Sequence, residues 1–310
     1  MNQRYTPTDR PSLTLDSSSD SPIQTQYLFN TDFYQFKHWD FDLDEPGVSH
    51  KGYNDCFCLV FVNQGRFVAQ LATQAYDLHT GHVLVEKANY EYQLRPASGA
   101  CSILNFSADF YQQLQEEYRL RHSFFFSNPN VLTLGLKTTP TIDYLHYHLR
   151  ERGRGMARLE RDQLVLDLVR HIVERLENNS LTAPLSTGYK QFHLTTIEQA
   201  KAYLNGEFNR DLSLLDLASH CCVSPFHLGR LFKACTGYAP HHYLLRIRLT
   251  HAERLLRDTS LPITEVSYAS GFNSVEHFAT SFRQWSQVSP SQYRKQAGQC
   301  FGKEQLTNPL

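Results

Sequence analysis

Two stretches of the chain decide the fold: LASHCCVSPFHLGRLF at residues 217–232 and VSYASGFNSVEHFATSF at residues 266–282. Each holds a small residue, a tight turn, a serine able to cap a helix and a helix with one apolar face. This order is typical of a helix-turn-helix. Matching positions are offset by 49 residues up to the turn and by 50 after it. One copy is weak evidence, because ordinary helical hairpins share the pattern, but two copies at a nearly constant offset indicate a duplicated unit.

The segment between the two copies is predicted to be a single helix. Residues 240–258 place Leu244, Ile247, Ala252 and Leu256 at helical spacing. At about 1.5 Å per residue the helix would be roughly 28 Å long. Successive major grooves on one face of B-DNA lie about 34 Å apart, so a stiff helix of this length suits two units that enter neighbouring grooves. We expect most of its arginines to pair within the chain or face solvent, namely Arg246, Arg248, Arg254 and Arg257.

Several helix starts carry recognisable caps. Ser224-Pro225 and Ser289-Pro290 each place a capping hydroxyl before a proline at the first helical position. Two further pairs have the spacing of capping boxes, Thr195 with Glu198 and Ser213 with Asp216. These signals predict an all-helical C-terminal third.

Length and charge bound the protein class. The 310 residues suggest about two domains. Residues 194–310 carry 12 Lys and Arg against 9 Asp and Glu, a net charge of +3, and residues 1–193 carry 18 against 22, a net of −4. This mild asymmetry is compatible with a nucleic-acid partner for the C-terminal part. The longest apolar run is CFCLVFV at 56–62, far short of the roughly 20 residues that span a membrane. We therefore expect a cytoplasmic protein without a membrane partner and with reduced thiols.

The front half changes character along its length. Short β-type runs broken by turn residues extend to about Phe106 and predict a small antiparallel barrel or sandwich. Helical spacing follows, most clearly in Leu164, Leu168, Ile172 and Leu176. This stripe has two interpretations of similar weight: a helix packed on its own barrel, or a homodimerisation helix at 159–176.

Residues 194–296 resemble the DNA-binding domain of AraC-type (AraC/XylS) transcription regulators. The resemblance covers about a third of the chain and is carried by Leu217-Ala218, Val223-Ser224, Leu228, Leu231-Phe232-Lys233, Thr236-Gly237, Pro240, Tyr243, Arg248, Ala252, Leu255-Leu256, Ile263, Val266, Gly271-Phe272, Phe278, Phe282, Ser289-Pro290 and Tyr293-Arg294. The front half is more diffusely similar to the cupin-like effector module of these regulators, with landmarks at Gly65, Gly81-His82-Val83 and Glu91-Tyr92. Two departures stand out: Cys222 replaces a common glycine, and Ser286-Gln287 replaces a usual Phe-Gly, with Trp285 able to fill the aromatic's space.

The resemblance implies an α+β protein, with an N-terminal cupin-like antiparallel β-barrel with helices and a C-terminal all-α double helix-turn-helix domain. It implies double-stranded DNA as partner, with a small-molecule effector and RNA polymerase as further candidate partners. The sign of regulation, the effector residues and the operator are not readable from the sequence. The expected divisions are an arm at 1–22, a sensing domain at 23–108, a helical and candidate dimerisation region at 109–177, a linker at 178–193, the DNA-binding domain at 194–296 and a tail at 297–310.

Periodicity separates the DNA-facing side chains from the core. We call the second helix of each helix-turn-helix its reading helix. The DNA-binding candidates on the first reading helix are Phe226, His227, Gly229, Arg230 and Lys233, and those on the second are Glu276, His277, Thr280 and Arg283. Ser224 and Ser274 lie at the starts of the two helices and are candidate phosphate sites. Arg230 is the best candidate for guanine O6 and N7, with a phosphate contact or solvation as the alternative. Lys233 is expected on phosphate. Glu276 suits cytosine N4, although phosphates repel it. Phe226 is expected either to contact a thymine methyl group or to pack against the protein core.

Two rival functions were weighed. A metal-dependent cupin enzyme needs a His-x-His pair with a nearby carboxylate, whereas His79 and His82 lack that spacing and His146-x-His148 lies in a helical stretch. We therefore expect no enzyme activity, no cofactor, and no catalytic or metal residues. A non-specific nucleoid-associated protein is the other rival. Six aromatic side chains of the barrel can line a pocket or form its core, and we favour the core: Trp39, Phe41, Tyr53, Phe57, Tyr90 and Tyr92.

Overall fold

The computed structural model describes residues 23–41, 50–71, 75–95, 99–118, 120, 124–177 and 194–303. The predicted arm at 1–22 and linker at 178–193 lie outside these ranges, as does the end of the predicted tail. Within them, none of the helices is long and apolar enough to cross a membrane.

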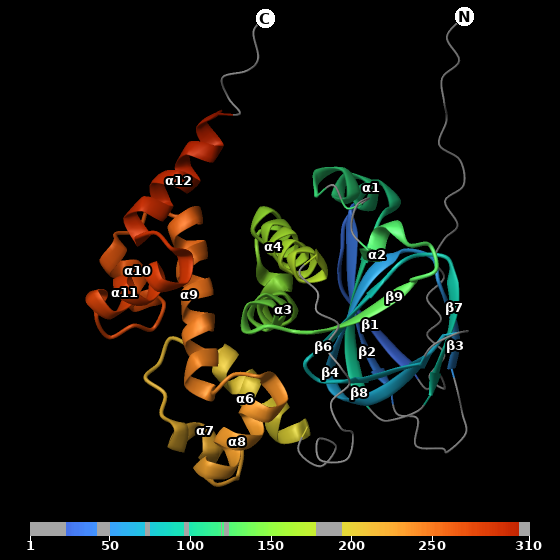
Figure 1. The fold of residues 1–310 in the computed structure, drawn as a ribbon, viewed down its shortest axis with the longest axis horizontal. Helices are drawn as coiled ribbons and strands as arrows, with labels where there is room; N and C mark the ends of the chain where they lie inside the picture. Colours follow the sequence, from blue (N-terminus) through green and yellow to red (C-terminus); the bar gives the residue numbers. More distant parts are fainter. Residues whose placement is uncertain are drawn as a thin grey trace, which may run out of the picture.

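The N-terminal domain is a nine-stranded sheet in which the pairings are antiparallel. Its strands are β1 Ile23–Asn30, β2 Tyr34–Phe41, β3 His50–Asn54, β4 Phe57–Gln70, β5 Ala75–His79, β6 His82–Glu86, β7 Tyr90–Arg95, β8 Gly99–Phe106 and β9 Thr133–Lys137. The main order is β1-β2-β8-β4-β6-β9, with β5 and β7 also on β4 and β3 on β7. The first half of β4 pairs with β6 and β8, and its second half pairs with β5 and β7. This one strand therefore connects the part of the sheet that contains β6 and β8 with the part that contains β5 and β7 (Figure 1).

The unbroken apolar run at the start of β4 follows from burial on both faces. Phe57, Leu59 and Phe61 belong to the core shared with the helices, whereas Cys58 and Val60 belong to the separate core inside the sheet. Successive side chains of a strand point to opposite faces, so a strand covered on both sides needs apolar residues at every position.

The region 109–177 contains a strand that the sequence analysis missed. It holds α1 Ala108–Glu117, α2 Phe124–Ser127, β9, α3 Pro140–Arg152, the short 3₁₀ helix Gly153–Gly155 and α4 Arg158–Glu177. β9 pairs with β6 in register from His82–Lys137 to Glu86–Thr133. The expectation of a wholly helical region is therefore wrong, because this five-residue strand takes its partner from a distant part of the chain.

The apolar stripe of α4 is core of its own chain. Leu164 and Leu168 are 0% exposed, and Ile172 and Leu176 are also buried. Of the two interpretations of the stripe, packing within the protomer is therefore the one that these four side chains follow, and a homodimer through 159–176 stays a prediction.

The C-terminal domain is entirely helical, as predicted. Its helices are α6 Leu194–Gly206, α7 Leu214–His220, α8 Pro225–Thr236, α9 Pro240–Asp258, α10 Ile263–Ala269, α11 Val275–Ser286 and α12 Pro290–Lys303. α12 continues past residue 296, so the predicted tail begins inside a helix. The Ser213–Asp216 capping box is formed. Glu198 has a different use, because its carboxylate accepts hydrogen bonds from Thr80 and from the Gly65 amide in the sheet domain.

The two domains meet along α3 and α4. Asp143 of α3 pairs with Lys201 of α6 at 2.8 Å and accepts from the Tyr243 hydroxyl of α9 at 2.9 Å. Asp167 of α4 pairs with Arg257 at the other end of α9, also at 2.8 Å. Figure 1 shows α3 and α4 on the side of α9 opposite to α10 and α11, so the domain contact leaves the second helix-turn-helix unit open.

Candidate nucleic-acid interface

The first helix-turn-helix unit consists of α7, a turn at residues 221–224 and α8. Cys222 in the turn has φ +53°. The Ser224 hydroxyl caps α8 by accepting from the His227 amide at 3.3 Å. Gly237 ends the helix at φ +83°. These local features let the chain change direction between α7 and α8 within the four residues of the turn.

The second unit, α10 and α11, repeats this backbone. Gly271 has φ +82° at the position matching Cys222, and Gln287 has φ +66° at the position matching Gly237. The Ser274 hydroxyl accepts from the His277 amide at 3.2 Å. The two turns and the two helix ends therefore share one conformation, whichever residue type occupies them.

Packing explains why only one of the two turns needs glycine. A Cβ at Gly271 would lie 2.6 Å from the Phe208 carbonyl oxygen and 2.8 Å from Asn209 Cα. The side chain of Cys222 is exposed instead. The first turn therefore tolerates a side chain at positive φ at a modest strain cost, as the departure from the glycine pattern indicated.

Aromatic and aliphatic side chains anchor the two reading helices. Leu228 and Phe232 of α8 and Phe278 and Phe282 of α11 are 0% exposed. Trp285 packs on Phe282 with ring centroids 5.5 Å apart, in agreement with its predicted role as a replacement aromatic. This packing fixes the rotation of each helix about its own axis.

The opposite faces of α8 and α11 present the predicted DNA-facing residues. Arg230, Lys233, Glu276, His277, Thr280 and Arg283 are exposed, whereas His227 and Gly229 are half-buried. The side chain of Phe226 lies outside the described residues. Both capping serines sit at helix starts, where free amides attract phosphate.

A negative charge is fixed at the start of the second reading helix. The Ser274 hydroxyl donates to the Glu276 carboxylate at 2.6 Å. This hydrogen bond lowers the pKa of Glu276 below its usual value, so the side chain is ionised at neutral pH. α8 offers Arg230 and Lys233 at its surface, and the two units therefore differ in charge.

The connecting helix α9 holds the units apart as one straight element. Its 19 residues give about 28 Å of length, and Figure 1 shows α7 and α8 near one end and α10 and α11 near the other. Arg248 donates to the carbonyls of Phe208 and Arg210. Arg254 and Arg257 face acids of α4. The expectation that most of these arginines pair within the chain is confirmed, and Arg246 remains exposed.

Comparison with known proteins assigns the duplicated helix-turn-helix to a family. A family model described as a helix-turn-helix domain matches residues 217–296. The HTH-type transcriptional activator AarP of Providencia stuartii is 30% identical over 116 residues, which cover 37% of this chain and 86% of AarP. The chain belongs to the AraC-type helix-turn-helix regulators.

The likeness of this AraC-type chain to larger relatives is partial. The HTH-type transcriptional regulator ArgR of Pseudomonas aeruginosa is 29% identical over 147 residues, 47% of this chain and 43% of ArgR. The matched part thus spans less than half the length of the first curated relatives. Among solved structures, the C-terminal domain of AraT from Geobacillus stearothermophilus shares 35% identity, with 33% of this chain and 84% of that chain covered and a TM-score of 0.32.

Sequence reasoning on the AraC-type chain missed the residues that join its domains. Asp143, Asp167 and Lys201 come from three separate helices and form no motif along the chain, and Arg257 of α9 was expected to pair within the chain but without a named partner. The only local signal was Glu198, whose capping-box spacing suggested a role within its own helix. Long-range ion pairs of this kind become visible only in the folded chain.

Proposed function

We propose that this protein is a sequence-specific DNA-binding transcription regulator that places α8 and α11 in successive major grooves of one duplex. One observation carries the proposal: two units of the same backbone, capped alike, present exposed polar faces from opposite ends of α9. Two reading helices held by a rod of about 28 Å suit the roughly 34 Å repeat of B-DNA.

Within this proposal each exposed side chain has a task. Arg230 donates to guanine O6 and N7, Lys233 neutralises phosphate, and Glu276 accepts from cytosine N4. Thr280 can serve either base type, while Ser224 and Ser274 mark the helix starts that face phosphate. His227, Gly229, His277 and Arg283 complete the surface, and the role of Phe226 stays a prediction. The fixed charge of Glu276 makes the second unit the more selective and the less adhesive of the two.

We also propose that a small molecule bound inside the sheet domain modulates DNA binding. A cavity of about 170 Å³ lies there, lined among others by Trp39, Phe67, Glu86 and Tyr92. The Trp39 indole N–H is buried and has no hydrogen-bond partner among the residues that the structure describes, which suits a ligand acceptor. Four of the six aromatics considered for the core line this cavity, namely Trp39, Phe41, Tyr53 and Tyr92. Phe41 also belongs to the buried core inside the sheet, against which Trp39 and Tyr92 pack, and Phe57 and Tyr90 are buried.

We propose further that the protein acts in the cytoplasm, because its target is chromosomal DNA. RNA polymerase is a further proposed partner. We also propose a homodimer, without assigning its contact surface. The relatives are named as transcriptional regulators, and we propose no catalytic activity. Among the described residues, no group of three or more His, Cys, Asp or Glu could hold a metal ion.

Selection of bound fragments from random DNA tests the proposed DNA recognition. We expect one enriched site bound at least about 10³-fold more tightly than random DNA at physiological salt. A ratio near one would favour the non-specific, nucleoid-packaging alternative instead.

A further inference from the structure

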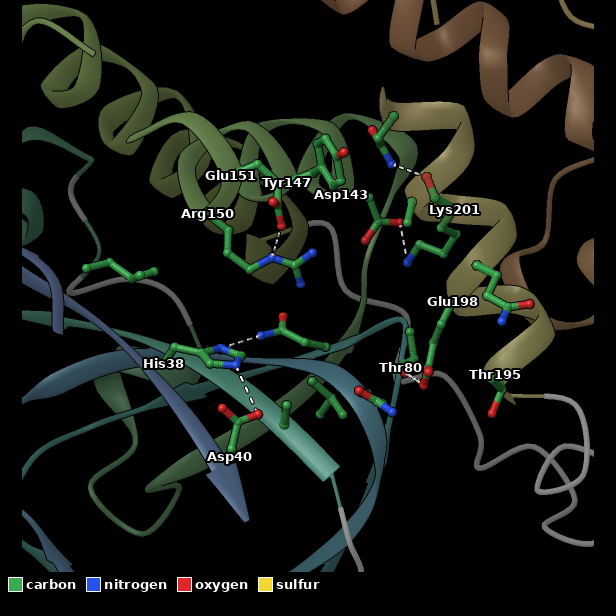
Figure 2. A pocket seen from close by; sticks show the side chains of 18 of the residues that line it. His38, Asp40, Thr80, Asp143, Tyr147, Arg150, Glu151, Thr195, Glu198 and Lys201 are labelled. Atoms are coloured by element: carbon green, nitrogen blue, oxygen red, sulfur yellow. Dashed lines mark hydrogen bonds and ion pairs between the residues drawn. The ribbon is translucent and has the colours of Figure 1, made fainter. Parts of the chain in front are cut away.

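A cleft of about 690 Å³ lies between the sheet, α3 and α6 and is lined by both domains. Ligand pockets in proteins range from about 300 to 1,000 Å³. Its walls carry His38 from β2, Thr80 beside β6, Arg150 from α3, and Glu198 and Lys201 from α6. Figure 2 shows these side chains converging from both domains. Any molecule held here touches the sheet domain and the first helix of the DNA-binding domain together.

Most of the acids in the cleft already have partners. Asp143 pairs with Lys201 and accepts from Tyr243. Glu151 accepts from Arg150 Nε at 2.8 Å, and Asp40 lies 3.3 Å from His38. Glu198 accepts from Thr80 and Gly65. The carboxylates are thus committed to the protein.

The cations of the cleft are less fully paired. Arg150 uses Nε for Glu151, and its two terminal nitrogens donate no hydrogen bond to any residue that the structure describes. Its guanidinium lies over the Tyr147 ring, 5.9 Å from the centroid, and its side chain is 26% exposed. Figure 2 shows the guanidinium directed into the cleft, across from His38. At the rim, Arg154 donates to the carbonyls of Tyr27 and Leu28.

We propose that this cleft binds a small hydrophilic organic anion whose carboxylate or phosphate oxygens are held by the terminal nitrogens of Arg150. A planar guanidinium with two free donors is suited to a bidentate oxyanion contact. Side-chain amides and a hydroxyl of Gln64, Thr195 and Gln199 line the same cleft and can supply further hydrogen bonds. These polar walls select a hydroxylated ligand over a long acyl chain.

The site differs from the cavity inside the sheet and bears on regulation. A ligand that contacts both domains binds only when they are placed as here, and therefore stabilises this arrangement. This consequence for DNA binding rests on the proposed function, whereas binding of the anion itself does not.

Isothermal titration of the full chain without DNA tests the site. The probes are gluconate, 6-phosphogluconate and inorganic phosphate, with sorbitol as the neutral counterpart. We expect saturable binding of at least one hydroxylated anion and none of sorbitol; phosphate alone tells whether the oxyanion suffices. Absence of binding by all three anions, or equal binding of sorbitol, overturns the proposal.

Variants of α3 assign the binding to Arg150. Arg150→Gln should raise the Kd about 10-fold or more, since a hydrogen bond to a charged group is lost, and Arg150→Lys should lie between it and the parent. Arg152→Gln, on the exposed side of the same helix, is the matched control and should bind as the parent does. Equal Kd values for the parent and Arg150→Gln overturn the assignment. Unchanged melting temperatures without ligand show that the variants fold.

Discussion

At the scale of single residues, the reading surface depends on a few side chains fixed by local hydrogen bonds. The hydroxyls of Ser224 and Ser274 cap α8 and α11 at equivalent positions. The sequence predicted both caps, because a serine before an amphipathic run is a local signal. It did not predict the Ser274–Glu276 hydrogen bond, since a rotamer choice decides which acceptor a serine hydroxyl takes.

Arg230 and Lys233 form a matched pair on one helix face. We expect Arg230→Ala to cost about 1–3 kcal/mol of binding free energy at the selected site and to relax base preference at one position. Lys233→Ala should weaken binding almost equally for all sequences and reduce the salt slope by about 1. Gel shifts across a salt series and a set of single-base variants measure both effects. Identical behaviour of the two variants would contradict the assignment of Arg230 to a base.

Gln287 carries strain that glycine would remove. Its φ of +66° lies in the left-handed region, which costs an L-residue roughly 1–2 kcal/mol. We expect Gln287→Gly to raise the free energy of unfolding by about 0.5–1 kcal/mol after the entropy cost of glycine. Gln284→Gly, in the exposed interior of the same helix, should lower it by about 1 kcal/mol. Urea unfolding measures both, and a loss of stability in Gln287→Gly would show that the site is not strained.

At the scale of helices and strands, sequence patterns predicted the elements whose backbone hydrogen bonds lie within the element itself. α9 has the predicted bounds, because proline starts it and its apolar spacing is regular. β9 was missed because TLGLK at residues 133–137 is short and depends on β6 for its hydrogen bonds. The use of the α4 stripe was open for the same reason: an apolar face does not reveal what covers it.

The ion pair between α4 and α9 is expected to stabilise the domain contact. Arg257 and Asp167 have side chains only 14% and 7% exposed. Breaking a buried pair by removing one partner costs about 3–5 kcal/mol; since Arg257 also contacts Asp258, we expect Asp167→Asn to lose about 3 kcal/mol. Glu174→Gln, half exposed on the same helix, should stay within about 0.5 kcal/mol. Urea unfolding compares them, and equal midpoints would contradict a structural role for this pair.

At the scale of the whole molecule, one apolar core extends from the sheet through α3 and α4 into the first helix-turn-helix unit, while the second unit has its own core. The double unit was predictable because duplication leaves a repeat in the sequence. The interdomain cleft was not, because its lining comes from residues between 26 and 205 that only folding brings together. A ligand in the cleft would contact α6, which in turn packs on α7 and α8 of the first unit.

The central claim is that both reading helices bind one duplex at once. Hydroxyl-radical footprinting of the full chain on its selected site tests this most directly. We expect two protected patches about 10 base pairs apart on the same face of the DNA, and Arg230→Ala should weaken one patch more than the other. A single patch, or two patches on opposite faces of the duplex, would contradict the account.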